Sequence, residues 1–386
     1  MEKRIFLIVL DGFGVGEAPD AQKYGDEGSN TFLNMHKQVK LDIPWLTKLG
    51  LKNIDGINLK FSTEDLIGSY GKLEELSAGK DTTTGHFEMM DIISKNPMPT
   101  YPNGFPKEVV EKLEQAFGTK IMFNKAGSGT DIINQCGDEH IRTKRPIVYT
   151  SADSVLQIAT HTDVYSLNEL YAMCEKAREI MSGKHAVGRV IARPFYTNKN
   201  GEYERLNGDR KDYALKPPVP NTMQRLYDNG FDVIAVGKIE DIFKGENITK
   251  SYANHTNKDS LKILKQLSKQ KFNGLCFVNL VDTDMLYGHR NDVKGYAKCV
   301  EEVDKILPEI IDNLNSQDYL IITGDHGNDP TTASNDHSRE YTPLLIYSKK
   351  QKVTNLGTLK GFNNIGKFIE KIFNITDDST VYKKWA

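Results

Sequence analysis

Four short apolar runs constrain the fold of this chain more than any other feature of its sequence. They lie at residues 5–10, 233–236, 275–281 and 319–323. Continuous apolar runs of about four to eight residues are typical of strands buried on both faces, as in parallel sheets covered by helices. Helical periodicity lies between the runs, at 258–269 and at 295–314, where Pro308 predicts a kink or a break. The alternation predicts an α/β core with a mostly parallel sheet flanked by helices.

The middle of the chain has a different pattern, which predicts a second domain. Polar stretches rich in Pro, Gly and Asn lie at 97–105 and 197–221. Helical and strand-like segments alternate between them, at 106–117, 147–153, 168–182 and 187–195. A chain of 386 residues also exceeds what one hydrophobic core usually organises. We therefore expect an inserted α+β cap domain at 97–214, between two core segments at 1–96 and 215–386.

Charge and composition argue against nucleic-acid and membrane partners. The net charge is -2, so no strong field attracts a polyanion or an anionic bilayer. The N-terminal apolar run ends at Asp11 and is too short to span a membrane or to act as a signal sequence. The 4 cysteines lie far apart and are expected to be buried free thiols of a reducing compartment. These features predict a soluble cytoplasmic protein that acts on small molecules.

Acidic residues and histidines follow three of the four apolar runs. Because the carboxyl ends of parallel strands meet at one edge of a sheet, these side chains are expected to lie together. Carboxylates combined with imidazoles favour Mn²⁺, Zn²⁺ or Fe²⁺, and two such ions about 4 Å apart suit a phosphoryl transfer. Any one of the residues alone is equally well explained as a cap or an ordinary surface group, so the prediction depends on their joint occurrence. The candidate ligands are Asp11, Asp284, His289, Asp325, His326 and His337.

The segment SAGKDTTTGHFEMM at 77–90 offers a candidate nucleophile. A threonine hydroxyl becomes reactive when a metal ion or a base stabilises its alkoxide, and any of Thr82–Thr84 could attack phosphorus in that way. The alternative is a threonine-rich turn that caps a helix containing Phe87, Met89 and Met90. Taken alone, the segment favours the turn, and the chemistry does not choose among the three threonines.

Polar residues of the expected insertion are candidates for substrate binding. Arg189 and the nearby Arg193 could hold a phosphate through the planar fork of the guanidinium group. Ser151 and Asp153 could bond sugar hydroxyls. Without further context, surface polar residues beside strands explain the same pattern.

Seven motifs together resemble those of bacterial phosphopentomutases, a family of the alkaline phosphatase superfamily. They are DGFGVGEAPD, GKDTTTGH, YTSADSVLQIA, GRVIARPF, DYALKP, NLVDTDMLYGHR and TGDHGNDPTTASNDHSREYTPLL. The DHGND element alone indicates only the superfamily, whereas YTSADSVLQIA and GRVIARPF, from the insertion, point to the family. The resemblance covers nearly the whole chain.

The resemblance implies a role for each candidate residue. Thr82 would be the phosphorylated nucleophile and would share one metal ion with Asp11, Asp325 and His326. The second ion would be held by the remaining ligands, Asp284, His289 and His337. The family's usual ion is Mn²⁺. The residues that would meet the ribose phosphate are Ser151, Asp153, Arg189 and Ile191 from the cap, and Lys238 from the core.

The implied reaction interconverts ribose 1-phosphate and ribose 5-phosphate, and the 2-deoxyribose pair, through a phosphothreonine and a 1,5-bisphosphate. The implied partners are pentose phosphates, with a sugar bisphosphate as activator. A metal-dependent phosphatase, or another phosphomutase of the superfamily, would use the same core and is the alternative. A protein that binds metal but has lost catalysis is a third hypothesis, although the nucleophile and all ligands are present in the sequence.

Overall fold

The computed structural model of the chain describes residues 2–57, 59, 61–151, 154–253, 256–376 and 380–385. The chain divides into two compact units. The core unit comprises Met1–Asn96 and Pro217–Ala386, and the inserted unit comprises Pro97–Lys216. The sequence predicted that the inserted domain spans residues 97–214, whereas the inserted unit of the structure spans 97–216.

One mixed sheet forms the centre of the core unit. Its strand order is β10-β9-β11-β1-β12-β13-β2-β14. The first five of these strands run parallel to one another, whereas β13 runs antiparallel to both of its neighbours. The sheet is therefore mostly parallel, as the apolar runs predicted. The strands are β1 (Arg4–Leu10), β2 (Ser69–Glu74), β9 (Asp232–Val236), β10 (Lys250–Tyr252), β11 (Gly274–Leu280), β12 (Tyr319–Gly324), β13 (Thr342–Tyr347) and β14 (Asn355–Lys360).

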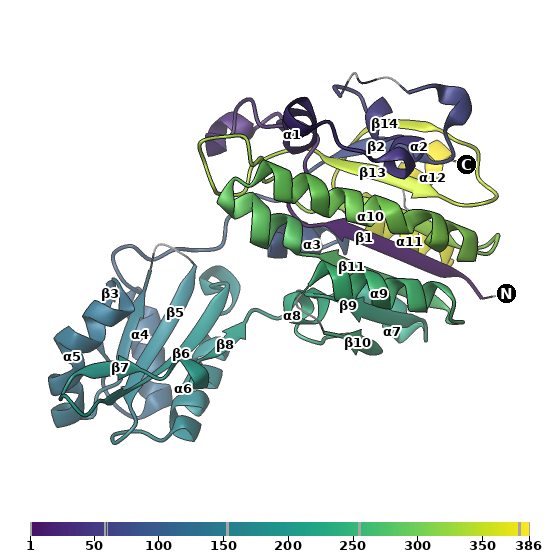
Figure 1. Cartoon of the computed structure of the whole chain (residues 1–386). Coiled ribbons are helices and arrows are strands. Elements are labelled where there is room, and N and C mark those ends of the chain that lie inside the picture. The colour runs from purple at the N-terminus through teal and green to yellow at the C-terminus, as the bar shows by residue number, and fades with distance from the viewer. Residues whose placement is uncertain are drawn as a thin grey trace. The chain divides into compact units, whose positions relative to one another are not determined.

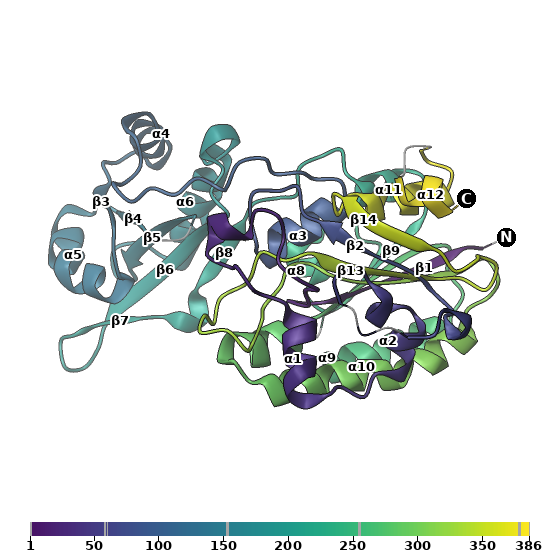
Figure 2. The same ribbon diagram turned by 90° about the horizontal axis from the view of Figure 1, so that it is seen from above.

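Helices cover both faces of this sheet (Figures 1 and 2). Alternate residues of β1 enter opposite layers, Ile8 on the side of α1, α2, α9 and α10 and Leu7 on the side of α3, α7, α8 and α11. The helices of the first layer are α1 (Thr31–Val39), α2 (Pro44–Lys48), α9 (Asn257–Ser268) and α10 (Val293–Asn313). Those of the second are α3 (Thr82–Met89), α7 (Thr222–Asp228), α8 (Ile239–Phe243) and α11 (Asn364–Ile372), and α12 (Thr380–Trp385) packs on α11. No helix of the described residues is both long and apolar enough to cross a bilayer.

One local prediction differs in part from the structure, and two strands were not predicted. Pro308 predicted a kink or a break, and helix α10 continues past it without a break. Its apolar side, which includes Val300, Val303 and Leu307, is fully buried, and packing of that side keeps the helix intact across the proline. The sequence also gave no signal for β2 and β14, which carry polar residues and lie at one end of the sheet.

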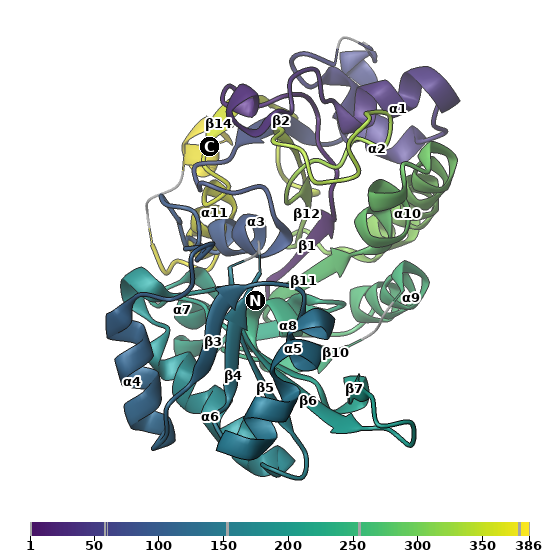
Figure 3. The same ribbon diagram turned by 90° about the vertical axis from the view of Figure 1, so that its left-hand side faces the viewer.

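The inserted unit has its own sheet, in the order β3-β4-β5-β6-β7 with β8 paired to β6. Helices α4 and α6 pack on one face and α5 on the other, where Figure 3 shows it crossing the strands. Each face therefore has its own small core. The strands are β3 (Met122–Ala126), β4 (Ile147–Thr150), β5 (Val155–His161), β6 (Arg189–Thr197), β7 (Tyr203–Arg205) and β8 (Lys211–Ala214). The helices are α4 (Lys107–Phe117), α5 (Gly129–Thr143) and α6 (Leu167–Ile180).

Candidate metal centre

Strand register brings the acidic residues to one edge of the core sheet. Leu10, the last residue of β1, pairs with Leu280 of β11 and with Gly324 of β12. Asp11 and Asp325 follow these strand ends directly, and Asp284 lies in the π-helical turn after β11. π-Helical turns are rare and occur frequently at functional sites. The three carboxylates therefore meet because three neighbouring parallel strands end in the same row.

The first group of side chains surrounds the threonine at the start of α3. The Nε2 atom of His326 lies 3.4 Å from Asp11 Oδ1 and 3.3 Å from Asp325 Oδ2. Thr82 Oγ1 lies 3.2 Å from the same Nε2 atom and 3.4 Å from Asp11 Oδ1. Asp81 caps α3 by accepting a hydrogen bond from the Thr84 amide. Of the three threonines, Thr82 is therefore the one whose hydroxyl contacts the acidic cluster.

The second group adjoins the first. Asp284 lies 3.2 Å from His289 Nε2 and 3.4 Å from His337 Nε2. The two imidazole Nε2 atoms are 3.2 Å apart. Donor atoms of Asp284, His326 and His337 also lie within 4.8 Å of one another, so His326 can reach both groups. The structure thus brings all six candidate ligands together, as one continuous cluster instead of two separate sets.

Burial and charge in this cluster fit divalent cations. Asp11 and Asp325 are fully buried, and burial together with the neighbouring Asp325 raises the pKa of Asp11. Burial would also raise the pKa of Asp284, but its hydrogen bonds with His289 and His337 outweigh burial and lower it. Among the described residues, Asp325 Oδ2 accepts no hydrogen bond of regular geometry, although ring nitrogens of His86 and His326 lie 3.2 and 3.3 Å from it. Buried carboxylates of this kind need compensating positive charge, which bound metal ions supply.

A second layer of polar side chains holds the ligands, and sequence reasoning assigned it no role. The side-chain amide of Asn279 donates to Asp11 Oδ2 over 2.8 Å and lies 3.2 Å from His86 Nε2. Because the amide nitrogen is a donor, Nε2 must accept, and the proton of neutral His86 resides on Nδ1. That Nδ1 atom lies 2.8 Å from the Thr82 carbonyl oxygen and 3.2 Å from Asp325 Oδ2. The available signals were a polar residue inside the apolar run of β11 and a histidine one helical turn after Thr82.

Replacing His86 with Ala is expected to weaken Mn²⁺ binding about 10- to 100-fold, the usual effect of losing a residue that orients a ligand. Titration calorimetry of the metal-free protein would measure the affinity. His36→Ala is the control, since His36 lies on α1 and outside the cluster. Equal affinity in the His86 variant and the wild type would contradict the role assigned to this layer.

The pH dependence of metal binding follows from His289. Its hydrogen bond with Asp284 raises the pKa of His289 to about 9, so the metal-free imidazole carries a proton at neutral pH. A ligating imidazole must be neutral, so binding displaces that proton. Between about pH 6 and pH 8 the apparent Mn²⁺ affinity should rise about tenfold per pH unit for each proton displaced. The folding stability of the metal-free protein should change with pH in the opposite direction. The pair of protonated His289 with Asp284 stabilises the fold at low pH, and this contribution is lost as pH rises through about 9.

Calorimetric titrations at several pH values, in buffers of different ionisation enthalpy, would count the protons released. An affinity that stays constant across this pH range would contradict ligation by His289.

The remaining candidates lie elsewhere in the two units. Lys238 follows Gly237 at the carboxyl end of β9, on the same sheet edge as Asp11. Ser151 follows β4 of the inserted unit, and Arg189 and Ile191 lie on β6. Asp153 lies outside the described residues. Substrate contacts of these five residues stay predictions.

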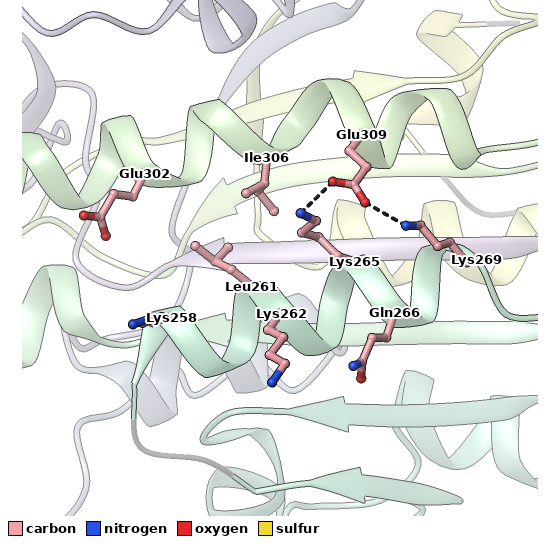
Figure 4. Close-up of a pocket in the computed structure, with 9 residues that line it drawn as sticks. All are labelled: Lys258, Leu261, Lys262, Lys265, Gln266, Lys269, Glu302, Ile306 and Glu309. Atoms are coloured by element: carbon pink, nitrogen blue, oxygen red, sulfur yellow. Dashed lines mark ion pairs between the residues drawn. The ribbon is translucent and has the colours of Figure 1, made fainter.

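A surface groove of about 470 Å³ between α9 and α10 is not part of this centre (Figure 4). It is lined by lysines of α9 and by Glu302, Ile306 and Glu309 of α10. Two of its lysines, Lys265 and Lys269, already pair with Glu309. None of the candidate metal ligands lines the groove, and its paired charges are typical of a solvated helix surface.

Comparison with known proteins identifies the class. A family model described as the Metalloenzyme superfamily matches residues 3–377. The structure of Leishmania mexicana phosphoglycerate mutase at low cobalt concentration aligns with a TM-score of 0.52 and 10% identity, over 98% of this chain and 96% of that chain. At that identity the likeness shows the fold alone. Fold, ligand cluster and family model define a member of the Metalloenzyme superfamily with a mixed α/β core.

Full-length relatives identify the family. The phosphopentomutase of Acetivibrio thermocellus is 50% identical over 378 residues, which cover 97% of each chain. That of Clostridium kluyveri is 51% identical over 379 residues, again 97% of each. That of Dictyoglomus thermophilum is 50% identical over 392 residues, 99% of this chain and 100% of the relative. The chain belongs to the phosphopentomutase family.

Proposed function

We propose that this protein interconverts ribose 1-phosphate and ribose 5-phosphate, and the corresponding 2-deoxyribose phosphates. The observation that carries the proposal is the contact of Thr82 Oγ1 with Asp11 and His326 at the edge of the buried ligand cluster. A nucleophile in that position can pass a phosphoryl group between itself and a sugar. Membership of the phosphopentomutase family supports pentose phosphates as the substrates.

The reaction would run through a phosphothreonine at Thr82. In the first half, the sugar hydroxyl forms a new bond to phosphorus as the bond to Thr82 Oγ1 breaks, and the hydroxyl proton passes to the threonine oxygen. The product is a 1,5-bisphosphate. After this intermediate reorients, Thr82 takes back the other phosphate by the reverse exchange. Atoms and charge balance over the cycle, and water takes no part.

Two divalent ions, which we take to be Mn²⁺, would supply the positive charge that stabilises the transferring group and the threonine alkoxide. Asp11, Asp325 and His326 would hold one ion beside Thr82, and the other group would hold the second. The second group comprises Asp284, His289 and His337, with His326 within reach of both. Carboxylate and imidazole donors in this proportion favour Mn²⁺ over Mg²⁺.

Five residues are proposed as contacts of the ribose phosphate. Ser151, Asp153, Arg189 and Ile191 of the inserted unit, together with Lys238 of the core unit, would hold the ribose phosphate. A sugar bisphosphate would act as activator by phosphorylating Thr82. We place the reaction in the cytoplasm, with the four free, buried cysteines as support.

The test is conversion without phosphate release. Purified protein with Mn²⁺ and a catalytic trace of a sugar bisphosphate is incubated with ribose 1-phosphate, and ³¹P NMR follows sugar phosphates and free phosphate together. Ribose 5-phosphate should replace ribose 1-phosphate while free phosphate stays constant. Phosphate that accumulates in step with substrate loss would make the protein a phosphatase and overturn the proposal.

A further inference from the structure

The inserted unit contains a cluster of positive charge that the metal centre does not use. Arg193 on β6 and Arg205 on β7 lie on the same sheet face as Tyr149 of β4, the face on which α5 packs. Burial raises the pKa of Tyr149, and the positive charges of both arginines and of Arg210 offset only part of that rise. The phenol therefore stays protonated and available as a donor.

Two of these three arginines, Arg193 and Arg205, have no carboxylate partner among the described residues. Asp212 bonds Arg210 over 2.7 Å and lies 3.6 Å from Arg189. Within the part of the chain that the structure describes, which excludes Asp153, no carboxylate pairs with Arg193 or Arg205. Burial lowers the pKa of Arg193, and the charges of Arg210 and Arg205 lower it further. Asp212 offsets only part of this charge. Guanidinium groups gathered with so little counter-charge form a surface suited to an anion.

The N-terminus of α5 meets the same cluster. This 15-residue helix begins at Gly129, and its N-cap residue, Ser128, makes no capping hydrogen bond. The amide groups of a first helical turn have no partner within the helix, and they favour an anion. A Cβ atom at Gly129 would overlap Arg205 Nη2 and lie 2.5 Å from the Tyr149 hydroxyl. Glycine here is what allows both side chains to reach the start of the helix.

Two donor atoms of the cluster have no hydrogen-bond partner in the described part of the chain. Tyr149 is 1% exposed, and its hydroxyl has no hydrogen bond among the described residues. The same holds for Arg205 Nε. A buried donor left unpaired is unfavourable by roughly 1–3 kcal/mol unless something accepts from it. The Tyr149 hydroxyl and the guanidinium group of Arg205 both lie beside Gly129 in the first turn of α5, so one acceptor with several oxygens could reach both.

We propose that the first turn of α5, Tyr149, Arg193 and Arg205 form an anion site that binds a phosphate monoester. Phosphate suits the site because its several oxygens can accept from a guanidinium fork, a phenol and backbone amides at once. The identity of the natural ligand rests on the proposed function. A pentose 1,5-bisphosphate has a second phosphate that needs its own counter-charge while the first reacts.

The site itself can be tested without the reaction. Full-length protein freed of metal is titrated with inorganic phosphate by calorimetry. Removing the metal leaves three carboxylates in the core cluster, which repel phosphate. Wild-type protein should bind one phosphate, and Arg205→Gln should weaken that binding at least tenfold. Arg142→Gln removes an equal charge from the exposed end of α5 and should change the affinity less than twofold.

Gly129→Ala tests the same site through the helix. The added methyl group would displace Arg205 and should also weaken phosphate binding at least tenfold. Circular dichroism confirms that each variant is folded. Arg205→Lys, which keeps the charge but loses the planar fork, provides a second variant should the alanine disrupt α5. Wild-type protein that binds no phosphate at millimolar concentration, or phosphate binding that is equal in the Arg205 variants, would overturn the site.

The natural ligand is tested separately, by kcat/KM for ribose 1-phosphate with Mn²⁺. Arg205→Gln should lower kcat/KM at least tenfold and Arg142→Gln should not. Arg205-dependent phosphate binding in a protein with no mutase activity would overturn the proposed function and leave the anion site standing. Weakened phosphate binding with unchanged kcat/KM would overturn the assignment of the bisphosphate as ligand.

Discussion

Thr82→Ala should lower the rate of ribose 1-phosphate conversion by about 10⁴-fold or more, because it removes the group that forms the covalent intermediate. The fold should be unchanged. Alanine is a good helix former at the first position of α3, and the cap comes from Asp81, whose side chain bonds Thr84. The ligand cluster loses only the hydroxyl contacts with Asp11 and His326, so Mn²⁺ affinity should fall by much less than activity.

Thr83→Ala is the matched control, since it removes the neighbouring hydroxyl from the same helical turn. No hydrogen bond of its side chain occurs among the described residues, and near wild-type activity is expected. Intact-protein mass spectrometry after incubation with a sugar bisphosphate gives a second measurement. Wild type and Thr83→Ala should take up one phosphate and Thr82→Ala none. An active Thr82→Ala enzyme, or one that still becomes phosphorylated, would show that another residue is the nucleophile.

The sequence predicted the fold class because buried parallel strands leave a strong signal. The four central strands are continuous apolar runs, and each observed strand lies within about a residue of the expected one, as with β1 at Arg4–Leu10 against 5–10. The edge region of the sheet left no such signal. β14 has the burial pattern of a half-exposed strand, and a run such as NLGTLK is equally typical of a loop.

The candidate site could be predicted as far as strand ends determine it. Asp11 and Asp325 follow buried strands directly, so a parallel sheet brings them together without further information. The choice among three threonines could not be made this way, because it depends on how the loop before α3 approaches the sheet. Gly85 allows that approach, since a Cβ atom there would overlap the Asp325 carbonyl oxygen. Nor can spacing show that His326 reaches both ligand groups.

The buried ion pairs could not be predicted from the sequence either. One of them, formed by Arg339, connects three segments that carry site residues. Arg339 is 3% exposed and lies two residues after His337. Its guanidinium group bonds Asp20 over 2.9 Å, the Gly79 carbonyl oxygen over 2.6 Å and the Glu75 carboxylate. It thus joins the segment that follows Asp11, the loop that precedes Thr82 and the segment that carries His337. No local pattern marks an arginine with three partners this distant in sequence.

Replacing Arg339 with Met should lower the free energy of unfolding by about 3–5 kcal/mol, because breaking a buried pair leaves the partner charge uncompensated. Burial raises the pKa of Glu75 and Arg339 opposes that rise, so the variant should raise the pKa of Glu75 further. The loops that hold Asp11 and Thr82 would lose their common anchor. Mn²⁺ affinity should therefore also fall about tenfold. This is the low end of the range observed when a residue that orients metal ligands is lost.

Arg4→Met separates the two effects. Arg4 forms an equally buried pair with Asp318, at 2.6 Å, but both residues lie at the amino ends of β1 and β12, the sheet edge opposite the ligands. Urea unfolding of the metal-free variants should show a comparable loss of stability in both, whereas calorimetry should show weaker Mn²⁺ binding only in Arg339→Met. If both variants lose stability but keep wild-type affinity, Arg339 stabilises the core unit without positioning the metal ligands. If Arg339→Met unfolds at the wild-type urea concentration, the buried network does not contribute the stability that its contacts imply.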